Sequence, residues 1–369
     1  MLSTARRLNI LLLALALAPA LHAAPQNRPA NSAAAPARVT FQPRFTPGQV
    51  MRYHLSLESN STTRQSGMVH DEQGPSQLDV TWDATVRLEV SAASNTGALP
   101  ASRAAGSVSP VRLRITYESS EAGVRSDTPE PRSDEIQQQY SQLAGRSLEF
   151  TMAADGRVSE IHGLEGLVDD AKTRDALQQW IVQLSAASGT PAGGVIPGQK
   201  WSATRAADLP LAGLSWRTDG AYLRNAPCRL AGASDASSVA ASPSERKDCA
   251  VIQSRLTLVT TRALRDPTPD DYRRNGMRTS GHWVGVGEGL MYVSLDTGWV
   301  ISSTQESTQN MDVTIAAALA DKAGFVRQAG AVTTRLQVLL LKQDDAVPAA
   351  PTAPPAPSSP AASPAAPSR

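Results

Sequence analysis

Apolar and polar residues alternate along most of the chain between residues 38 and 345. The longest such run covers residues 78–90, and shorter runs begin at Met51, Val111 and Val332. A period of two gives a strand one buried face and one wet face, which is typical of antiparallel sheets. The pattern therefore predicts several antiparallel strands, some of them longer than the usual five or six residues.

Helical periodicity occurs in two places, both between two blocks of predicted strands. Ile136, Tyr140 and Leu143 recur at helical spacing, and Ser133 is a candidate N-cap in front of them. A longer helical pattern covers residues 164–186. This order of elements predicts an α+β, β-rich fold: curved antiparallel sheets, half-barrel or sandwich-like, with one or two covering helices.

The longer helical pattern has an apolar face that can be interpreted in two ways. The face is formed by Leu177, Trp180, Ile181 and Leu184. If the helix is a lid, these side chains line a ligand cavity beneath it. If the helix is structural, the same side chains seal the core.

Residues 1–23 have the features of a bacterial Sec-type signal peptide. A basic start precedes a short apolar stretch at residues 10–17, too short to span a bilayer of roughly 30 Å, and Ala23 is the preferred cleavage site. Residues 24–37 are predicted to be an Ala/Pro-rich linker, and residues 346–369 a disordered tail of Pro, Ala and Ser. We therefore expect a periplasmic or secreted protein without a transmembrane helix.

Two local similarities suggest two β-modules, residues 38–160 and 195–345, joined by a helical connection at residues 161–194. A Pro-Gly-Gln turn at residues 47–49 recurs at residues 197–199, and each copy leads into a strand. A hairpin with Gly in its turn follows later in each module. Duplication explains these similarities, but so does the general likeness of short hairpins.

The succession of these motifs resembles a family of exported bacterial proteins whose domain has no assigned function. The motifs are LEFTMAADGRVSEIHGLEGL at residues 148–167, PGQKW at 197–201 and GLMYVSLDTGWVISSTQESTQNMDV at 289–313. The resemblance covers most of residues 40–315 and implies two β-rich modules around a central helix. It brings no catalytic or ligand-binding residues to this chain, which departs from the family in an insert after Cys228 and in its tail.

The composition excludes several classes of function. The chain of 369 residues has 35 Lys and Arg against 34 Asp and Glu, so it lacks the basic character of a nucleic-acid-binding protein. Aromatic residues make up only 4%, which disfavours stacking platforms for bases. Two cysteines are too few for a four-thiolate zinc site.

We find no pattern typical of catalysis, and we predict no catalytic, cofactor-binding or metal-ligating residues and no cofactor. The histidines after residue 23 are His54, His70, His162 and His282, and no two of them have metal-ligand spacing. Residues 244–247 match Ser-x-x-Lys by letters only, within a Ser/Ala-rich insert. Residues 285–289 resemble a glycine-rich phosphate loop, but a strand follows them, so we expect a bend or bulge there.

Cys228 and Cys249 are predicted to form a disulfide. They flank the Ser/Ala-rich insert, and strand-like segments lead into and out of it. In an oxidising compartment two cysteines in such positions pair across the base of the loop.

Taken together, these features predict a non-enzymatic envelope protein that binds an apolar ligand, a lipid or a protein partner. The expectation rests on the amphipathic strands and on the missing catalytic pattern. The alternatives are a structural or assembly protein of the cell envelope and, less favoured, an outer-membrane β-barrel or a hydrolase. Barrels need more interfacial aromatic residues than this chain offers.

Overall fold

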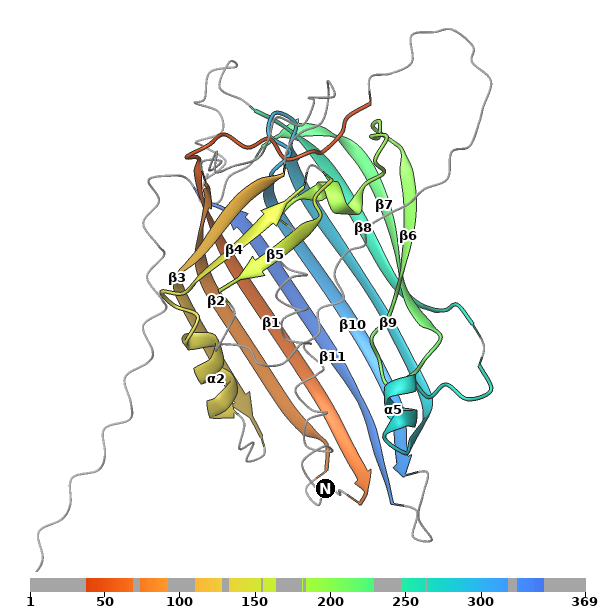
Figure 1. The fold of residues 1–369 in the computed structure, drawn as a ribbon. Coiled ribbons are helices and arrows are strands. Elements are labelled where there is room, and N and C mark those ends of the chain that lie inside the picture. Colours follow the sequence, from red (N-terminus) through yellow and green to blue (C-terminus); the bar gives the residue numbers. More distant parts are fainter. Residues whose placement is uncertain are drawn as a thin grey trace, which may run out of the picture.

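The structure is a computed structural model. It describes residues 38–68, 74–91, 110–127, 133–153, 155–163, 181, 184–228, 247–262, 264–317 and 324–341. The described residues form a single 11-stranded antiparallel sheet in the order β5-β4-β3-β2-β1-β11-β10-β9-β8-β7-β6 (Figure 1). Two short α-helices accompany this sheet, so the predicted β-rich α+β fold with a curved antiparallel sheet is confirmed.

The strands and helices have the following bounds. The first block contains β1 (Val50–Gly67), β2 (Ser76–Val90), β3 (Val111–Ser126), α2 (Ser133–Ser141), β4 (Ser147–Met152) and β5 (Val158–His162). The second contains the 3₁₀ turn η2 (Ala186–Gly189), β6 (Lys200–Ala206), β7 (Leu214–Pro227), β8 (Asp248–Thr260), α5 (Asp270–Arg274), β9 (Met277–Ser294), β10 (Val300–Ala317) and β11 (Phe325–Leu340).

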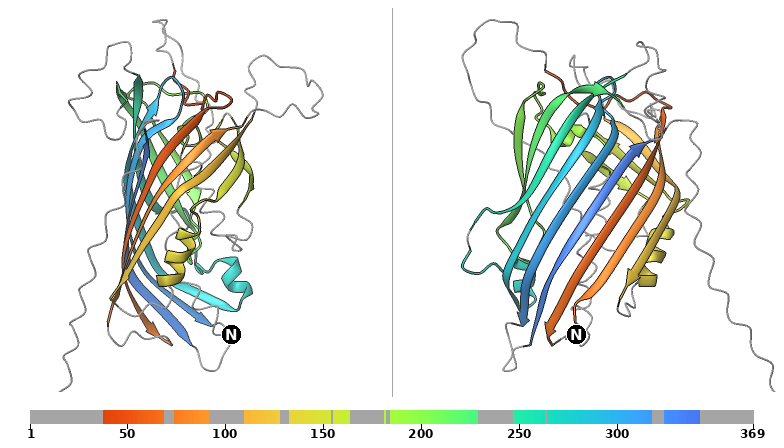
Figure 2. Two further views of the ribbon diagram at one scale, coloured as in Figure 1. Left: turned by 90° about the vertical axis from the view of Figure 1, so that its left-hand side faces the viewer. Right: turned by 180° about the vertical axis from the view of Figure 1, so that it is seen from behind.

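The sheet is long and strongly curved. Strands β1, β9 and β10 each have 18 residues, a length of roughly 60 Å at about 3.3 Å per residue. Figure 2 shows the sheet from its edge, with α2 and α5 on the hollow side. Seen from behind, the sheet carries no described helix on its outer side. We call the hollow side the concave face and the other side the convex face.

The last strand in the sequence joins the two blocks. Strand β11 lies between β1 and β10, and its register with β1 runs from Tyr53 opposite Leu340 to Gly67 opposite Val326. Strands β1–β5 and β6–β10 therefore follow each other across the sheet in the same order, with β11 between them. The division into modules at the predicted boundaries remains a prediction, because both blocks belong to one sheet.

The repeated Pro-Gly-Gln turns have the same hydrogen bonds in both copies. In the first turn, Gly48 N–H donates to the Val90 carbonyl, and the Val90 N–H donates back to Gln49. In the second turn, Gly198 and Gln199 make the same pair of bonds with Tyr222. Both glycines have a positive φ, +79° and +85°, which the second central position of a type II turn requires. Each turn thus fixes the start of a strand against its hairpin partner.

Three groups of buried apolar side chains lie on the concave face. The first cluster includes Tyr53, Leu88, Leu113, Phe150, Ile181, Leu184 and Trp299. The tryptophan cluster consists of Leu211, Trp216, Leu256, Leu258, Trp283, Met311 and Val313. A smaller group contains Phe41, Ala186, Val195, Tyr222, Ala250, Ile252 and Val293.

Several predictions concern residues outside those that the structure describes. They are the signal peptide at residues 1–23, the linker at 24–37, the tail at 346–369 and most of the helix predicted at 164–186. The predicted helix around Tyr140 is confirmed by α2, which begins at the candidate N-cap residue Ser133.

The expectation of a bend or bulge at residues 285–289 is wrong. Strand β9 runs through them from Met277 to Ser294, and its register with β10 is unbroken from Tyr292 to Met277. His282 lies within the same strand. The prediction was wrong because glycines occupy the inward positions, where a strand normally carries apolar side chains.

Candidate ligand-binding face

The two faces of the sheet differ sharply in charge. The registers place the charged residues of the described strands on the convex face, with two exceptions. Asp248 is the exposed first residue of β8, and Arg205 lies within β6 opposite Trp216. The strands therefore present an almost uncharged surface on the concave side, which is the property that an apolar ligand requires.

The convex face carries ion pairs between side chains of different strands. Arg327 of β11 donates two hydrogen bonds to the Asp312 carboxylate of β10, with N–O distances of 2.7 and 2.6 Å. These bonds hold the pKa of Asp312 below its usual value. Arg52 and Glu118 form a similar pair at 2.6 Å. Such pairs contribute little to stability in water, but they keep this face hydrophilic.

A band of small and uncharged side chains crosses the middle of the concave face. We define this central band by Ser59, Ser61, Ser254, Gly285, Gly287, Gly289, Gln305, Ser307, Gln309 and Thr334. Along β1 and β11 it begins directly after Leu57 and Leu336 of the first cluster, and along β10 it ends before Met311 of the tryptophan cluster. The band thus divides the first cluster from the tryptophan cluster.

The central band contains hydrogen-bonding groups but few bulky side chains. Ser59 and Thr334 lie opposite each other with their hydroxyl oxygens 3.5 Å apart. Gln309 accepts a hydrogen bond from the Trp283 indole at 3.1 Å. Gly287, Gly289 and Ser307 remain partly exposed, in contrast to the buried clusters on either side. The band can therefore contact a ligand through hydroxyls, amides and bare backbone.

Strand β9 has its glycines on the concave face and its apolar side chains on the convex face. Gly285, Gly287 and Gly289 face inward, opposite Gln309, Ser307 and Gln305 of β10. Val284 and Val286 face outward and are 53% and 59% exposed. A strand that served only to build a core would have the opposite arrangement, because burying the valines would stabilise the fold.

Tryptophan rings use part of the space that the glycines leave. A Cβ atom added at Gly285 would lie 2.5 Å from the ring of Trp216, which comes from β7, two strands away. A Cβ added at Gly220 would lie 2.3 Å from the ring of Trp201 on the adjacent strand. At these two positions the concave floor of the second block is built from a tryptophan ring over a glycine.

The predicted cavity-lining residues fall into two pairs. Ile181 and Leu184 are fully buried in the first cluster. The Leu184 carbonyl accepts a hydrogen bond from the N–H of Val300 at 3.4 Å, and Ser185 forms a bridge with Trp299. Leu177 and Trp180 lie outside the described residues. Whether the four line a cavity or seal the core stays a prediction.

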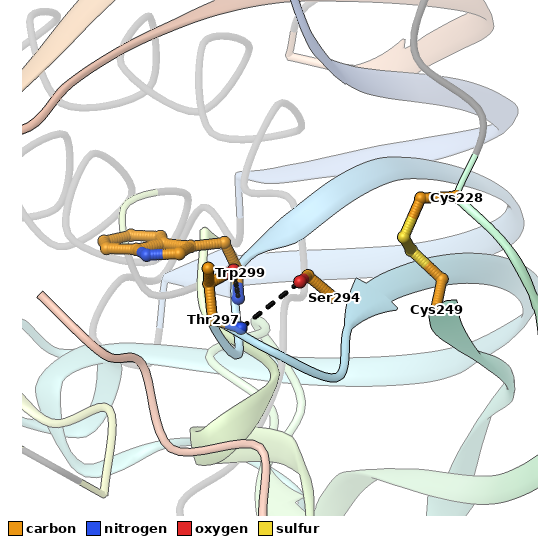
Figure 3. Close-up of a disulfide and its surroundings, with 5 residues drawn as sticks. All are labelled: Cys228, Cys249, Ser294, Thr297 and Trp299. Carbon is orange, nitrogen blue, oxygen red and sulfur yellow. Dashed lines mark hydrogen bonds between the residues drawn. A yellow bond between two sulfur atoms is a disulfide. The ribbon is translucent and has the colours of Figure 1, made fainter. Parts of the chain in front are cut away.

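The predicted disulfide is present at one end of the sheet (Figure 3). Cys228 follows β7 and Cys249 lies in β8, with their Cα atoms 5.0 Å apart. Cys249 is buried and pairs in register with Ser294 of β9. The bridge therefore closes the insert at its base, as the sequence predicts.

The described histidines and carboxylates do not gather into a metal site. Groups of three or more His, Cys, Asp or Glu that could hold a metal are absent from the described part of the chain. On the convex face, His54 Nε2 lies 3.3 Å from Asp83 Oδ1. His282 lies on the same face, opposite Asp312. His70 is outside the described residues.

Tyr53 is a buried polar group on the concave face. Its hydroxyl has no hydrogen-bond partner among the described residues, and burial raises its pKa well above the ordinary value. Tyr140 of α2 packs against Trp82, with ring centroids 5.4 Å apart, and burial raises the pKa of Tyr140 to about 12. Both hydroxyls stay protonated at neutral pH, so neither adds charge to this face.

Comparison with known proteins gives only distant likenesses. Neither a protein-family model nor a curated protein matches the sequence. A structure titled "Lipid-protein interactions in lipovitellin" is similar at 12% identity and a TM-score of 0.40, over 85% of this chain. This chain spans only 27% of that one.

Two solved outer-membrane proteins are more distant still. An outer membrane channel from Pseudomonas putida F1 has 11% identity and a TM-score of 0.16, and the outer membrane protein OprG from Pseudomonas aeruginosa has 6% and 0.14. The comparisons cover 81% of this chain and 98% of each of those chains. Likenesses at these TM-scores carry no argument about function.

None of the helices in the described part of the chain is long and apolar enough to cross a membrane.

Proposed function

We propose that this protein is an exported, non-enzymatic binding protein that holds a lipid or similar apolar ligand against its concave face. The membership of the chain in the family of exported proteins that it resembles, and its periplasmic or secreted location, belong to the same proposal. The disulfide between Cys228 and Cys249 supports an oxidising compartment.

The observation that carries the proposal is the inverted arrangement of β9. Its inward glycines give up the apolar burial that Val284 and Val286 would supply if they faced the core. Inward glycines allow close approach of another group to the backbone. The strands carry almost no charge on this face, and apolar clusters flank the glycines, so an alkyl chain is the group best suited to the space that Trp216 does not occupy.

The central band favours a ligand that contains hydrogen-bonding groups as well as an alkyl chain. Its hydroxyls and amides can satisfy the ester or hydroxyl groups that accompany alkyl chains in lipids, without any charge. Small sites in proteins commonly combine a largely apolar lining with a few polar groups that fix orientation. A lipid with an uncharged linkage near the middle therefore fits the band better than a plain hydrocarbon.

The test is lipid uptake by a protein in which the band is filled. Gly287→Val adds a branched side chain on the concave face, and its Cβ atom, 2.8 Å from the Glu306 carbonyl oxygen, requires a small shift of the β10 backbone. Val286→Leu changes the adjacent residue on the convex face as a control. Purified protein, freed of bound lipid, is titrated with a fluorescent fatty acid, and folding is checked by circular dichroism. We expect Gly287→Val to reduce the affinity by about tenfold and Val286→Leu to leave it unchanged.

Two results would count against the proposal. One is the absence of any uptake by the unaltered protein, which would favour the alternative of a structural or assembly protein. The other is unchanged affinity in a well-folded Gly287→Val protein. Native mass spectrometry of the protein as purified adds an independent check, because a bound lipid adds its mass to that of the chain.

A further inference from the structure

Four successive inward positions of β10, a strand near the middle of the sheet, carry uncharged polar side chains (Figure 1). We call these residues the polar row: Ser303, Gln305, Ser307 and Gln309. The residues opposite them on β11 are buried and mostly apolar: Val338, Leu336, Thr334 and Val332. At the same level of the sheet, β11 therefore supplies side chains typical of a core, and β10 does not.

Three side chains of the polar row have no hydrogen-bond partner among the described residues. Gln309 is the exception, since its amide oxygen accepts a hydrogen bond from the Trp283 indole at 3.1 Å. The side chains of Ser303, Gln305 and Ser307 make no such bond, although Ser303 is only 7% exposed. A polar group that is withdrawn from water without a partner destabilises a fold. The polar row is therefore better suited to an occupied concave face than to an empty one.

The β9 residues opposite Gln305 and Ser307 have no side chains, because they are Gly289 and Gly287. The hydroxyl of Ser254 on β8 reaches over Gly289, since a Cβ atom added to this glycine would lie 2.7 Å from the hydroxyl oxygen. The Ser254 side chain also makes no hydrogen bond to the described residues. Hydroxyls and an amide that can both donate and accept therefore lie beside bare backbone, where a ligand can approach closely.

Among the described strands, no cation lies beside the polar row on the concave face. Arg335 lies at this level of the sheet, but it faces the convex side opposite Glu306. Arg205 faces the concave side on β6, four interstrand steps or roughly 19 Å from β10, and already interacts within the protein. A carboxylate or phosphate at the polar row would lose hydration without gaining an ion pair from these strands. An ester or hydroxyl loses much less, and the polar row can replace its hydrogen bonds to water.

We propose that the polar row recognises the uncharged head group of a neutral acylglycerol, with Gln305 as the residue that sets the preference. The inference rests on the proposed lipid-binding function and narrows the ligand to lipids that carry ester and hydroxyl groups but no charge. The Gln305 amide can donate to an ester carbonyl and accept from a hydroxyl. Ser303 and Ser307 lie two residues away on either side, about 7 Å along the strand, and can bind further oxygens of the head group.

The experiment compares ligands of equal chain length that differ in their head group. Purified protein, freed of bound lipid, is titrated at neutral pH with a monoacylglycerol, the methyl ester and the free fatty acid, and tryptophan fluorescence reports binding. The unaltered protein should bind the monoacylglycerol at least about fivefold more tightly than either of the others. Gln305→Met keeps the length of the side chain but removes its hydrogen bonds, so it should abolish most of this preference. Circular dichroism checks that the variant is folded.

The matched control is Gln337→Met, which makes the same change on the adjacent strand β11 but on the convex face, opposite Thr304. It should retain the full preference for the monoacylglycerol. If the unaltered protein binds the fatty acid at least as tightly as the monoacylglycerol, the inference is overturned and the proposed function still stands. A well-folded Gln305→Met protein that keeps the full preference, or an equal loss in both methionine variants, would also overturn the inference.

Absence of binding by all three ligands would instead defeat the proposed function itself. Ser307→Ala provides a second variant in case Gln305→Met does not fold, because it removes a single hydroxyl from the same row. It should lower the affinity for the monoacylglycerol by roughly threefold and leave the affinity for the methyl ester unchanged. A Ser307→Ala protein with unaltered affinity for the monoacylglycerol would contradict recognition by the polar row.

Discussion

The two halves of the concave face differ in what occupies them, although both are built from five-stranded meanders in the same order. In the half formed by β1–β5, inward positions carry large apolar side chains such as Leu88, Leu113 and Phe150, all fully buried. In the half formed by β6–β10, the corresponding surface contains glycines, serines and amides next to the tryptophan cluster. The first half therefore turns mainly large apolar side chains inward, whereas the second half turns smaller and polar side chains inward over much of its length.

This difference shows that strand order and turn geometry do not determine what a sheet face does. The two Pro-Gly-Gln turns start their strands with the same hydrogen bonds, and the β-meanders that follow have the same order. What differs is the size of the inward side chain at alternate positions. A repeated framework can thus carry large buried side chains in one half and the face of the proposed binding site in the other.

The largest effect is expected from truncating the closed half. Phe150→Ala removes a fully buried ring opposite Leu113 and should cost about 3–5 kcal/mol of unfolding free energy. Met291→Ala in the second half removes a side chain that is only partly buried and should cost less than half as much. Urea denaturation of both variants measures the difference, and equal costs would abolish the distinction between the halves.

A smaller effect is expected from adding a single methyl group to the second half. Gly285→Ala places a Cβ atom 2.5 Å from the Trp216 ring and should destabilise the fold by about 1–3 kcal/mol, with a change in tryptophan fluorescence. Gly189→Ala is the control, since an added Cβ there would meet nothing within 4 Å. If stability and fluorescence are unaltered in Gly285→Ala, the position of the Trp216 ring does not require a glycine at residue 285.

Removal of a buried tyrosine hydroxyl should change stability in opposite directions in the two halves. Tyr53→Phe deletes a hydroxyl that has no partner among the described residues, so stability should stay the same or rise by up to about 1 kcal/mol. Tyr222→Phe deletes a hydroxyl that donates to Asn225 and should lose about 1 kcal/mol. Thermal denaturation of the two variants measures these changes in stability. A clear loss of stability in Tyr53→Phe would reveal a hydrogen-bond partner beyond the described residues.

The smallest effect is expected on the convex face, which both halves share. Asp312→Asn breaks the pair with Arg327 and should lower Tm by on the order of a degree or less. Because the hydrogen bond from Arg327 holds the pKa of Asp312 below 3.8, the stabilisation is present above that pH and is lost as the pH falls below it. The difference between the two proteins should therefore shrink as the pH falls below 3.8, and it should also shrink at high salt.

Much of the fold could be predicted because alternation is a local signal. The runs at residues 78–90 and after Met51, Val111 and Val332 lie within β2, β1, β3 and β11, and they also identify the inward face. The place of β11 could not be predicted, since Tyr53 and Leu340 pair over a long stretch of sequence that leaves no trace in the local pattern. The sequence therefore does not reveal that the strands of both predicted modules belong to one sheet.

The candidate site was less accessible to sequence reasoning for a related reason. The rule that apolar side chains mark the buried face fails on β9, where Val284, Val286 and Leu290 face the solvent. Their spacing of two residues was the available signal for a strand, but the intervening glycines concealed it. Arg205 has the same spacing as Trp201 and Ala203 on the concave face of β6, yet nothing in the sequence alone distinguishes it from a solvated arginine.

The position of β11 has a consequence for how the chain reaches its final state. Chains are synthesised from the N-terminus, so residues 325–340 arrive after all other strands, although they occupy the centre of the sheet. Until then, β1 and β10 each present a long unpaired edge, the kind of surface on which strands from other molecules can add. Closing the gap requires pairing over a very large sequence separation, which makes folding slow. The final strand thus acts as a kinetic bottleneck, and a protein truncated before Phe325 is expected to aggregate as two open half-sheets.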